Sequence, residues 1–197
     1  TARLPYGTKS SQSVERYAKR AVNCLVQQYG VDAVVVACNT ASAYATEPLQ
    51  AEFQDIPIFS VIEPSARAAI EAVEGVHQPL IGVLATEGTV RGNAYTNVIH
   101  KEMPQATIVS QACQLLVALA EEGWTEGKIA SLIVHQYLRG LFEQRHRWPQ
   151  TVVLGCTHFP LLVNEIKRAA IELGATATTI IDPSIEIAKT VANAIGP

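Results

Sequence analysis

The chain has 197 residues, of which 48% are hydrophobic and 17% are charged, and its formal net charge is −3 at pH 7. This composition is typical of a globular protein with one domain or two small ones. The negative charge argues against the broad basic surface that binds nucleic acid, and no apolar run reaches the length of a membrane span. Four cysteines are too few for a disulfide scaffold, so we expect free thiols and a reducing, cytoplasmic location.

The first part of the chain predicts a loop followed by alternating helices and strands. Pro5 and Gly7 interrupt regular structure in residues 1–10, with Tyr6 between them. Pro48 predicts a kink or a break in the second helical pattern. The elements expected here are a helix over 13–28, a strand over 34–37, a helix over 40–53, a strand over 56–62 and a helix over 65–73.

The rest of the chain continues the same alternation. The expected elements are a strand over 80–85, a helix over 90–102, a strand over 107–109, a helix over 125–146, a strand over 151–154, a helix over 161–173, a strand over 178–181 and a helix over 185–195. Strands that alternate with helices are typical of parallel sheets, because a parallel connection needs a long crossover. The sequence therefore predicts an α/β fold with mainly parallel sheets.

Two segments of the chain repeat one order of residue types. In each, an apolar run leads to a cysteine, Cys38 in the first and Cys156 in the second, and two polar residues and a helical pattern follow. At nearly the same offset after each cysteine, a strand-like run ends in an acid, a proline and a serine, at residues 63–65 and 182–184. Such an internal duplication predicts two related halves and a cleft with one cysteine on either side.

The position of these cysteines indicates chemistry, because ligands of open α/β sheets bind outside the carboxyl ends of the strands. A helix N-terminus there also favours a thiolate. Four kinds of site would use such thiols: a redox pair, a metal site with His158, a cysteine nucleophile with His158 as its base, or two-base proton transfer at a stereocentre. No C-x-x-C spacing supports the first, and no further Cys/His cluster supports the second. The third leaves Cys38 unexplained, whereas the fourth uses both thiols.

Polar residues beside the predicted strand ends add further candidates. Thr86 and Thr89 flank a glycine at one such end, where their hydroxyls can hold a carboxylate, cap a helix, or do both. His158 lies two residues after Cys156, where it can tune or shuttle the proton of that thiol. The alternative for His158 is an ordinary ring that hydrogen-bonds to the backbone.

Five motifs together resemble the aspartate/glutamate racemase family, and its glutamate branch in particular. The resemblance runs the length of the chain and implies two similar α/β domains related by a pseudo-two-fold axis, with the active site in the cleft between them. It assigns residues 1–62 plus 178–197 to the first domain and 63–177 to the second. In chain order, the motifs are Pro5-Tyr6-Gly7, Ala37-Cys38-Asn39-Thr40-Ala41-Ser42, Ile62-Glu63-Pro64, Thr86-Glu87-Gly88-Thr89 and Gly155-Cys156-Thr157-His158.

The resemblance also implies an activity and the residues that perform it. The activity would be racemisation of glutamate without pyridoxal phosphate or a metal, supplying D-glutamate for peptidoglycan synthesis. Cys38 and Cys156 would abstract the α-proton of D- and L-glutamate respectively, His158 would assist Cys156, and Glu121 would be a second helper on that side. The residues that would bind the substrate are Pro5, Tyr6, Gly7, Asn39, Thr40, Thr86, Thr89, Thr157 and His158.

Two departures from the family pattern set the alternatives. The family begins with a strand that ends in Asp-Ser-Gly, and this sequence starts after it, so we expect a fragment or a protein without that half-site. Gln114 stands where the family usually has proline, with a small local effect expected. The alternatives are an aspartate or hydantoin racemase of the same family, or a truncated relic that binds glutamate without turning it over. A homodimer is one expected oligomeric state, and neither nucleic acid nor a membrane is an expected partner.

Overall fold

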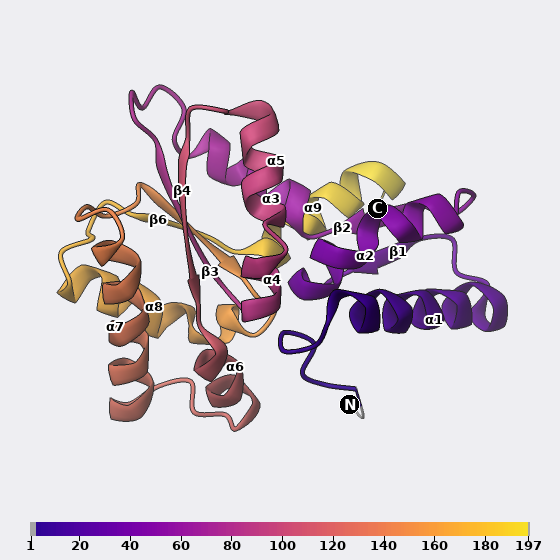
Figure 1. Ribbon diagram of the computed structural model, residues 1–197, viewed down its shortest axis with the longest axis horizontal. Helices are drawn as coiled ribbons and strands as arrows, with labels where there is room; N and C mark the ends of the chain where they lie inside the picture. The colour runs from indigo at the N-terminus through magenta and orange to yellow at the C-terminus, as the bar shows by residue number, and fades with distance from the viewer. Residues whose placement is uncertain (1–2, 197) are drawn as a thin grey trace.

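The computed structural model describes residues 3–196 and contains two parallel sheets with helices packed around them (Figure 1). Neighbouring strands in both sheets run parallel, which confirms the predicted α/β class with mainly parallel sheets. Within the described residues, no helix is both long and apolar enough to cross a membrane. The smaller sheet pairs β1 (Val34–Val36) with β2 (Ile58–Ser60), and the larger has the order β4 (Thr107–Ala112), β3 (Leu80–Ala85), β5 (Thr151–Gly155) and β6 (Thr179–Ile181).

The smaller sheet packs against two helices, α1 (Ser11–Tyr29) and α2 (Asn39–Glu52). The buried residues of α1 recur at intervals of four, at Val14, Ala18 and Val22, and form one core cluster with both strands and α2. Burial of this stripe holds the two-stranded sheet in place, because an isolated pair of strands is only marginally stable in water.

The larger sheet is covered by helices on both faces, which explains why every residue of β3 is buried. Leu80 and Leu84 join one core cluster, and Ile81 and Val83 join another, as the two-residue period of a strand requires. The helices on the first face are α6 (Gln114–Glu121), α7 (Lys128–Glu143) and α8 (Val163–Glu172). The 3₁₀ turn η1 (Phe159–Leu162) comes directly before α8. The helices on the second face are α3 (Ile62–Glu71) and α5 (Ala94–Glu102).

The chain crosses between the two sheets at α3 and again at α9 (Pro183–Ile195). Helix α3 follows β2 of the smaller sheet and packs on β5 and α5, while α9 follows β6 and contacts both α3 and β2. In Figure 1 these two helices lie between the smaller sheet and the larger one. Strand β6 hydrogen-bonds to β5 in the larger sheet, so the assignment of residues 178–197 to the first domain stays a prediction.

Among the helix boundaries that differ from the sequence prediction, two have a clear local cause. Helix α3 begins at Ile62 rather than at residue 65, and Pro64 lies in its first turn, where a missing N–H costs no helical hydrogen bond. The single helix predicted over 90–102 is two helices, α4 (Glu87–Arg91) and α5. The break falls at Gly92 and at Asn93, which adopts a left-handed conformation with φ 50°.

Three further differences concern the helices α2, α6 and α7, and tertiary packing accounts for the first of them. Helix α2 runs through Pro48 to Glu52 without a break, because Ala45 and Leu49 on either side of the proline are fully buried in the core. Helix α6 was not predicted, since its short apolar run lacks the polar residues at helical spacing that would mark an amphipathic helix. The long helix predicted over 125–146 is shorter, at Lys128–Glu143.

Candidate active site

Cys38 lies at the carboxyl end of β1 and directly before the first turn of α2. Its carbonyl accepts a hydrogen bond of 2.8 Å from the N–H of Ser42 and so caps the start of the helix. The N–H groups of Ala41 and Thr40 and the Thr40 hydroxyl favour the charged form of its sulfur, while the cysteine side chain makes no capping hydrogen bond. The free N–H groups of a helix N-terminus are therefore directed at this thiol.

Cys156 occupies the equivalent place after β5, with a different set of neighbours. Its Sγ lies 3.7 Å from Nδ1 of His158, and Nε2 of the same ring lies 2.5 Å from the Glu121 carboxylate at the end of α6. A carboxylate on one ring nitrogen orients the imidazole and supports a proton on that nitrogen. The structure thus brings together the three residues that the sequence assigned to this side.

Burial dominates the acidity of both thiols. It raises the pKa of Cys38, and the N–H groups of Ala41 and Thr40 offset this only in part. Burial also raises the pKa of Cys156 to about 12; the N–H of His158 counteracts this, while negative charge on Cys38 raises it further. The N–H groups at the helix N-terminus do favour the Cys38 thiolate, as the sequence indicated, but desolvation of the charged sulfur outweighs their contribution.

Three threonine hydroxyls form a buried cluster beside the start of α2. The Oγ1 of Thr40 lies 2.8 Å from that of Thr86 and 3.2 Å from that of Thr89, and the last two are 3.1 Å apart. The hydroxyl of Thr86 also accepts the N–H of Thr89 and caps α4, so the capping interpretation is confirmed. Because Thr40 comes from the smaller unit and the other two from the larger, the cluster joins the two halves.

The loop that carries Tyr6 and Gly7 contacts this cluster. The carbonyl of Gly7 accepts a hydrogen bond of 2.8 Å from the N–H of Gly88, and a Cβ on Gly7 would lie 2.6 Å from Cβ of Thr86. Tyr6 is close enough to Cys38 for negative charge on that sulfur to raise the pKa of the phenol, after burial as the main cause. Pro5 is exposed, so its assignment to the site stays a prediction.

Asn39 and Thr157 also link the two halves. The amide oxygen of Asn39 accepts a hydrogen bond of 2.6 Å from the hydroxyl of Tyr95 on α5. The hydroxyl of Thr157, directly after Cys156, donates to the carbonyl of Ala37, directly before Cys38, at 2.8 Å. The two cysteine segments therefore meet at adjacent residues, although 120 positions separate the bonded pair.

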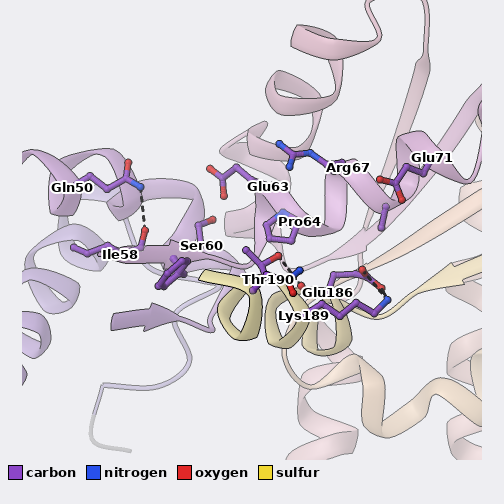
Figure 2. A pocket seen from close by; sticks show the side chains of 13 residues that line it. Gln50, Ile58, Ser60, Glu63, Pro64, Arg67, Glu71, Glu186, Lys189 and Thr190 are labelled. Carbon is purple, nitrogen blue, oxygen red and sulfur yellow. Dashed lines mark hydrogen bonds and ion pairs between the residues drawn. The ribbon is translucent and has the colours of Figure 1, made fainter. Parts of the chain in front are cut away.

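A separate pocket of about 420 Å³ lies between β2, α3 and α9 (Figure 2). Its wall carries polar and charged side chains, among them Ser60, Glu63 and Arg67, and the Gln50 amide donates to the Ile58 carbonyl at 3.2 Å. No cysteine occurs among the described residues that line it, so it is not a second candidate for thiol chemistry. Among residues 3–196, no group of three or more His, Cys, Asp or Glu side chains is arranged to hold a metal ion.

Comparison with known proteins identifies the class to which this fold and site belong. Residues 1–191 match the Asp/Glu/Hydantoin racemase family, and the chain belongs to that family. The resemblance inferred from the motifs is thereby confirmed, and the protein is of the amino-acid racemase class, an isomerase.

Particular relatives are glutamate racemases. The chain is 44% identical to the glutamate racemase of Geobacter metallireducens over 192 residues, which are 98% of this chain and 67% of that protein. It is 32% identical to the crystal structure of Francisella tularensis glutamate racemase in complex with D-glutamate, with a TM-score of 0.85 over 98% of this chain and 68% of the other. The aspartate racemase of Picrophilus torridus, at 16% identity and a TM-score of 0.56 over 90% of this chain and 69% of the other, shares the fold alone.

Sequence reasoning missed some residues that support the site. Tyr95 and Tyr44 were not candidates, yet the first hydrogen-bonds to Asn39 and the second donates to the Gly88 carbonyl at 2.7 Å. Neither tyrosine carries a local signal, because a tyrosine on a helix face is ordinarily a packing residue. Their partners lie far away in the sequence and become neighbours only in the folded chain.

Proposed function

We propose that the protein racemises glutamate without a cofactor, by moving the α-proton between two cysteine thiols on opposite faces of the substrate. The observation that carries this proposal is the placement of Cys38 and Cys156. Each follows the carboxyl end of a parallel strand in a different sheet. The two sulfurs are near enough for negative charge on Cys38 to raise the pKa of Cys156. A stereocentre held between them would have one acid/base group on each face.

The proposed reaction begins and ends with one thiolate and one thiol, and both sulfurs are thiols while the negative charge is on the substrate. From D-glutamate, the Cys38 thiolate removes the α-proton and becomes a thiol, while the electron pair of the C–H bond stays on Cα. The Cys156 thiol then donates its proton to the opposite face of Cα and becomes the thiolate. The two roles exchange for L-glutamate, so protons and charge balance in both directions.

The acidity of the two sulfurs supports this arrangement. Because negative charge on Cys38 raises the pKa of Cys156, a state with both sulfurs ionised is disfavoured. The α-ammonium of glutamate would supply the positive charge that two buried sulfurs need for one of them to ionise. His158, oriented by Glu121, would assist on the Cys156 side.

The proposed substrate has two carboxylates and an ammonium group, and the residues beside the thiols match them. The hydroxyls of Thr40, Thr86 and Thr89 and the amide of Asn39 would donate to carboxylates, with Tyr6, Gly7 and Thr157 completing the site. Pro5 is included by its resemblance to the family motif alone. Glutamate rather than aspartate is favoured because the relatives that match at 38–44% identity are glutamate racemases.

The product, D-glutamate, would supply peptidoglycan synthesis. We place the reaction in the cytoplasm, where the four free cysteines stay reduced. A homodimer also stays a prediction.

Exchange of the α-proton in D₂O tests the two-thiol mechanism. The parent chain, Cys38→Ser and Cys156→Ser are each incubated with D- or L-glutamate, and with aspartate for comparison. Deuterium incorporation is followed by NMR and inversion by circular dichroism. We expect the parent to exchange and racemise glutamate, and each serine variant to lose racemisation by at least about 10³-fold, since serine is a far weaker acid/base group.

Cys24→Ser is the matched control, because Cys24 is a half-buried thiol on α1 that hydrogen-bonds to Gln28. It should racemise like the parent. Racemisation that survives either active-site substitution would contradict the two-thiol mechanism. A folded parent that exchanges neither enantiomer would contradict the proposed activity and favour a relic that only binds glutamate.

A further inference from the structure

Asn39 carries a buried polar group without a partner. Its side chain is 2% exposed, and its Nδ2 makes no hydrogen bond to any residue in the range 3–196. A buried amide N–H₂ without an acceptor is unfavourable, and native structures seldom keep one without a reason. Since Asn39 lies between Cys38 and Thr40, the free donor lies within the proposed glutamate site.

The other end of the same amide is fixed. The hydroxyl of Tyr95 donates to Oδ1 of Asn39 at 2.6 Å, from the first turn of α5 in the larger half. Tyr95 is 3% exposed, and its ring packs against Gly155, where a Cβ would lie 3.2 Å from Cε2 of the ring. The tyrosine therefore has little room to move, and its hydroxyl can hold one orientation of the amide.

The hydroxyl of Tyr95 remains a donor at any working pH. Burial raises the pKa of this phenol well above its usual range and outweighs the opposing influence of the Ser65 hydroxyl, while negative charges on Cys156 and Glu63 raise it further. A carboxamide has two flip states, of which one presents an oxygen and the other presents two N–H donors. Donation to Oδ1 selects the state in which Nδ2 is the group left free.

We propose that Tyr95 is a positioning residue, which orients the Asn39 amide so that Nδ2 donates to a carboxylate of the substrate. This inference rests on the proposed glutamate racemase function and adds a residue to it. Without the hydroxyl, the amide would also populate the flipped state, in which Oδ1 would repel the carboxylate. The loss would fall on substrate affinity more than on proton transfer.

Tyr95→Phe tests this role, since it keeps the ring and removes only the hydroxyl. We expect KM for both enantiomers to rise on the order of tenfold, as for the loss of a hydrogen bond to a charged group, with kcat changed much less. In an Asn39→Ala background, Tyr95→Phe should have no further effect on KM, because the residue through which it acts is gone. Tyr137→Phe is the matched control, because the Tyr137 hydroxyl accepts from the Leu115 N–H outside the site.

Asn39→Asp provides a test that does not depend on the folding of a tyrosine variant. It keeps an acceptor for Tyr95 and lacks both N–H donors, so it should lose glutamate affinity at least as strongly as Asn39→Ala. An affinity like that of the parent would overturn the role of Nδ2.

Side-chain amide signals of Asn39 in ¹H–¹⁵N spectra test the hydrogen bond itself. They should shift in Tyr95→Phe and stay in place in Tyr137→Phe, whether or not the protein turns over. Unmoved signals, an unchanged KM, or an equal rise of KM in both backgrounds would overturn the positioning role while leaving the racemase function intact. A folded parent that neither binds nor converts glutamate would overturn the proposed function, and this inference with it.

Discussion

The two cysteine segments begin from the same order of residue types and acquire different surroundings. The Cys38 sulfur lies at the start of a fourteen-residue helix, α2, where backbone N–H groups and one hydroxyl favour its charged form. The Cys156 sulfur lies beside an imidazole that is oriented by a carboxylate from another helix. Fixed dipoles support negative charge on the Cys38 sulfur, whereas the His158 imidazole supports it on the Cys156 sulfur.

The difference follows from what comes after each cysteine. Asn39 and Thr40 lead directly into α2, so the N–H groups of its first turn face the sulfur. After Cys156, residues 157 and 158 form a turn before the short 3₁₀ turn η1, which leaves the His158 ring free to meet Glu121. A duplicated motif therefore fixes where a thiol lies, while the neighbouring elements decide how its charge is supported.

The largest effect should come from removing the support that only one side has. His158→Asn should lower kcat by about 10²-fold, the range expected for loss of an acid/base assistant. The enantiomers have equal energy, so kcat/KM must fall equally in both directions. The asymmetry should appear in the kinetic isotope effects. The isotope effect measured with α-deuterated L-glutamate, from which Cys156 would take the proton, should increase more than the one measured with α-deuterated D-glutamate.

His135→Asn is the matched control for that experiment. His135 forms the same kind of pair, with Nε2 at 2.8 Å from Glu172, but on α7 and α8. It should leave the rate and both isotope effects unchanged. Equal isotope effects for the two enantiomers in His158→Asn would remove the proposed division of labour.

The next effect should come from separating the loop of Gly7 from the threonine cluster. In Gly88→Ala, the new Cβ would lie 2.8 Å from the Gly7 carbonyl oxygen and 3.0 Å from Cγ2 of Thr40. Backbone at that distance must shift, so we expect activity to fall roughly tenfold or more, as for small displacements of substrate-positioning groups. Steady-state kinetics would measure this. Gly140→Ala, which meets only the flexible end of Gln111, should stay active.

A smaller effect should reveal the coupling between the two thiols. With a pKa of about 12, Cys156 is protonated below that value, so its alkylation rate should rise about tenfold per pH unit from pH 7 to pH 10. A free thiol with pKa near ~8.5 would level off in that range. At a pH high enough to ionise Cys38, removing that charge in Cys38→Ser should lower the pKa of Cys156 and speed its alkylation severalfold. Peptide mass spectrometry after timed iodoacetamide treatment measures both, and a plateau near pH 9 would contradict the raised pKa.

The smallest effect should come from the hydrogen bond between the two cysteine segments. Thr157→Val removes the donor to Ala37 and should lower the free energy of unfolding by about 1 kcal/mol or less, since the side chain is exposed. Thr178→Val removes a similar bond of 2.7 Å to Pro149 within the larger half. Denaturant unfolding should give comparable losses, whereas glutamate affinity should fall only in Thr157→Val. If Thr157→Val and Thr178→Val bind glutamate with equal affinity, the bond from Thr157 to Ala37 only stabilises the fold.

Periodicity predicted most of the elements correctly and failed where local signals were weak. The strand over residues 80–85 was predicted with its observed bounds, because both faces are buried and the run is apolar throughout. Helix α6 was missed for the opposite reason, since a short apolar run gives no period. The break at Gly92 and Asn93 was missed because a left-handed residue is only weakly signalled by asparagine.

Most candidate site residues could be named from motifs, since strand ends and helix starts have recognisable residue types. The acidity of the thiols could not, because it depends on how completely the sulfur loses water. Tyr95 could not be named either, since its partner Asn39 is 56 positions away.

The sequence by itself determined the α/β class, the two thiols at matched strand ends and the family. These properties depend on the order of apolar, small and polar residues along short segments. Only the tertiary structure decided that Thr157 bonds to Ala37, that Glu121 meets His158, and that Tyr95 donates a hydrogen bond to the amide of Asn39. Such contacts depend on the packing of distant elements, and packing also sets the loss of water that raises both thiol pKa values.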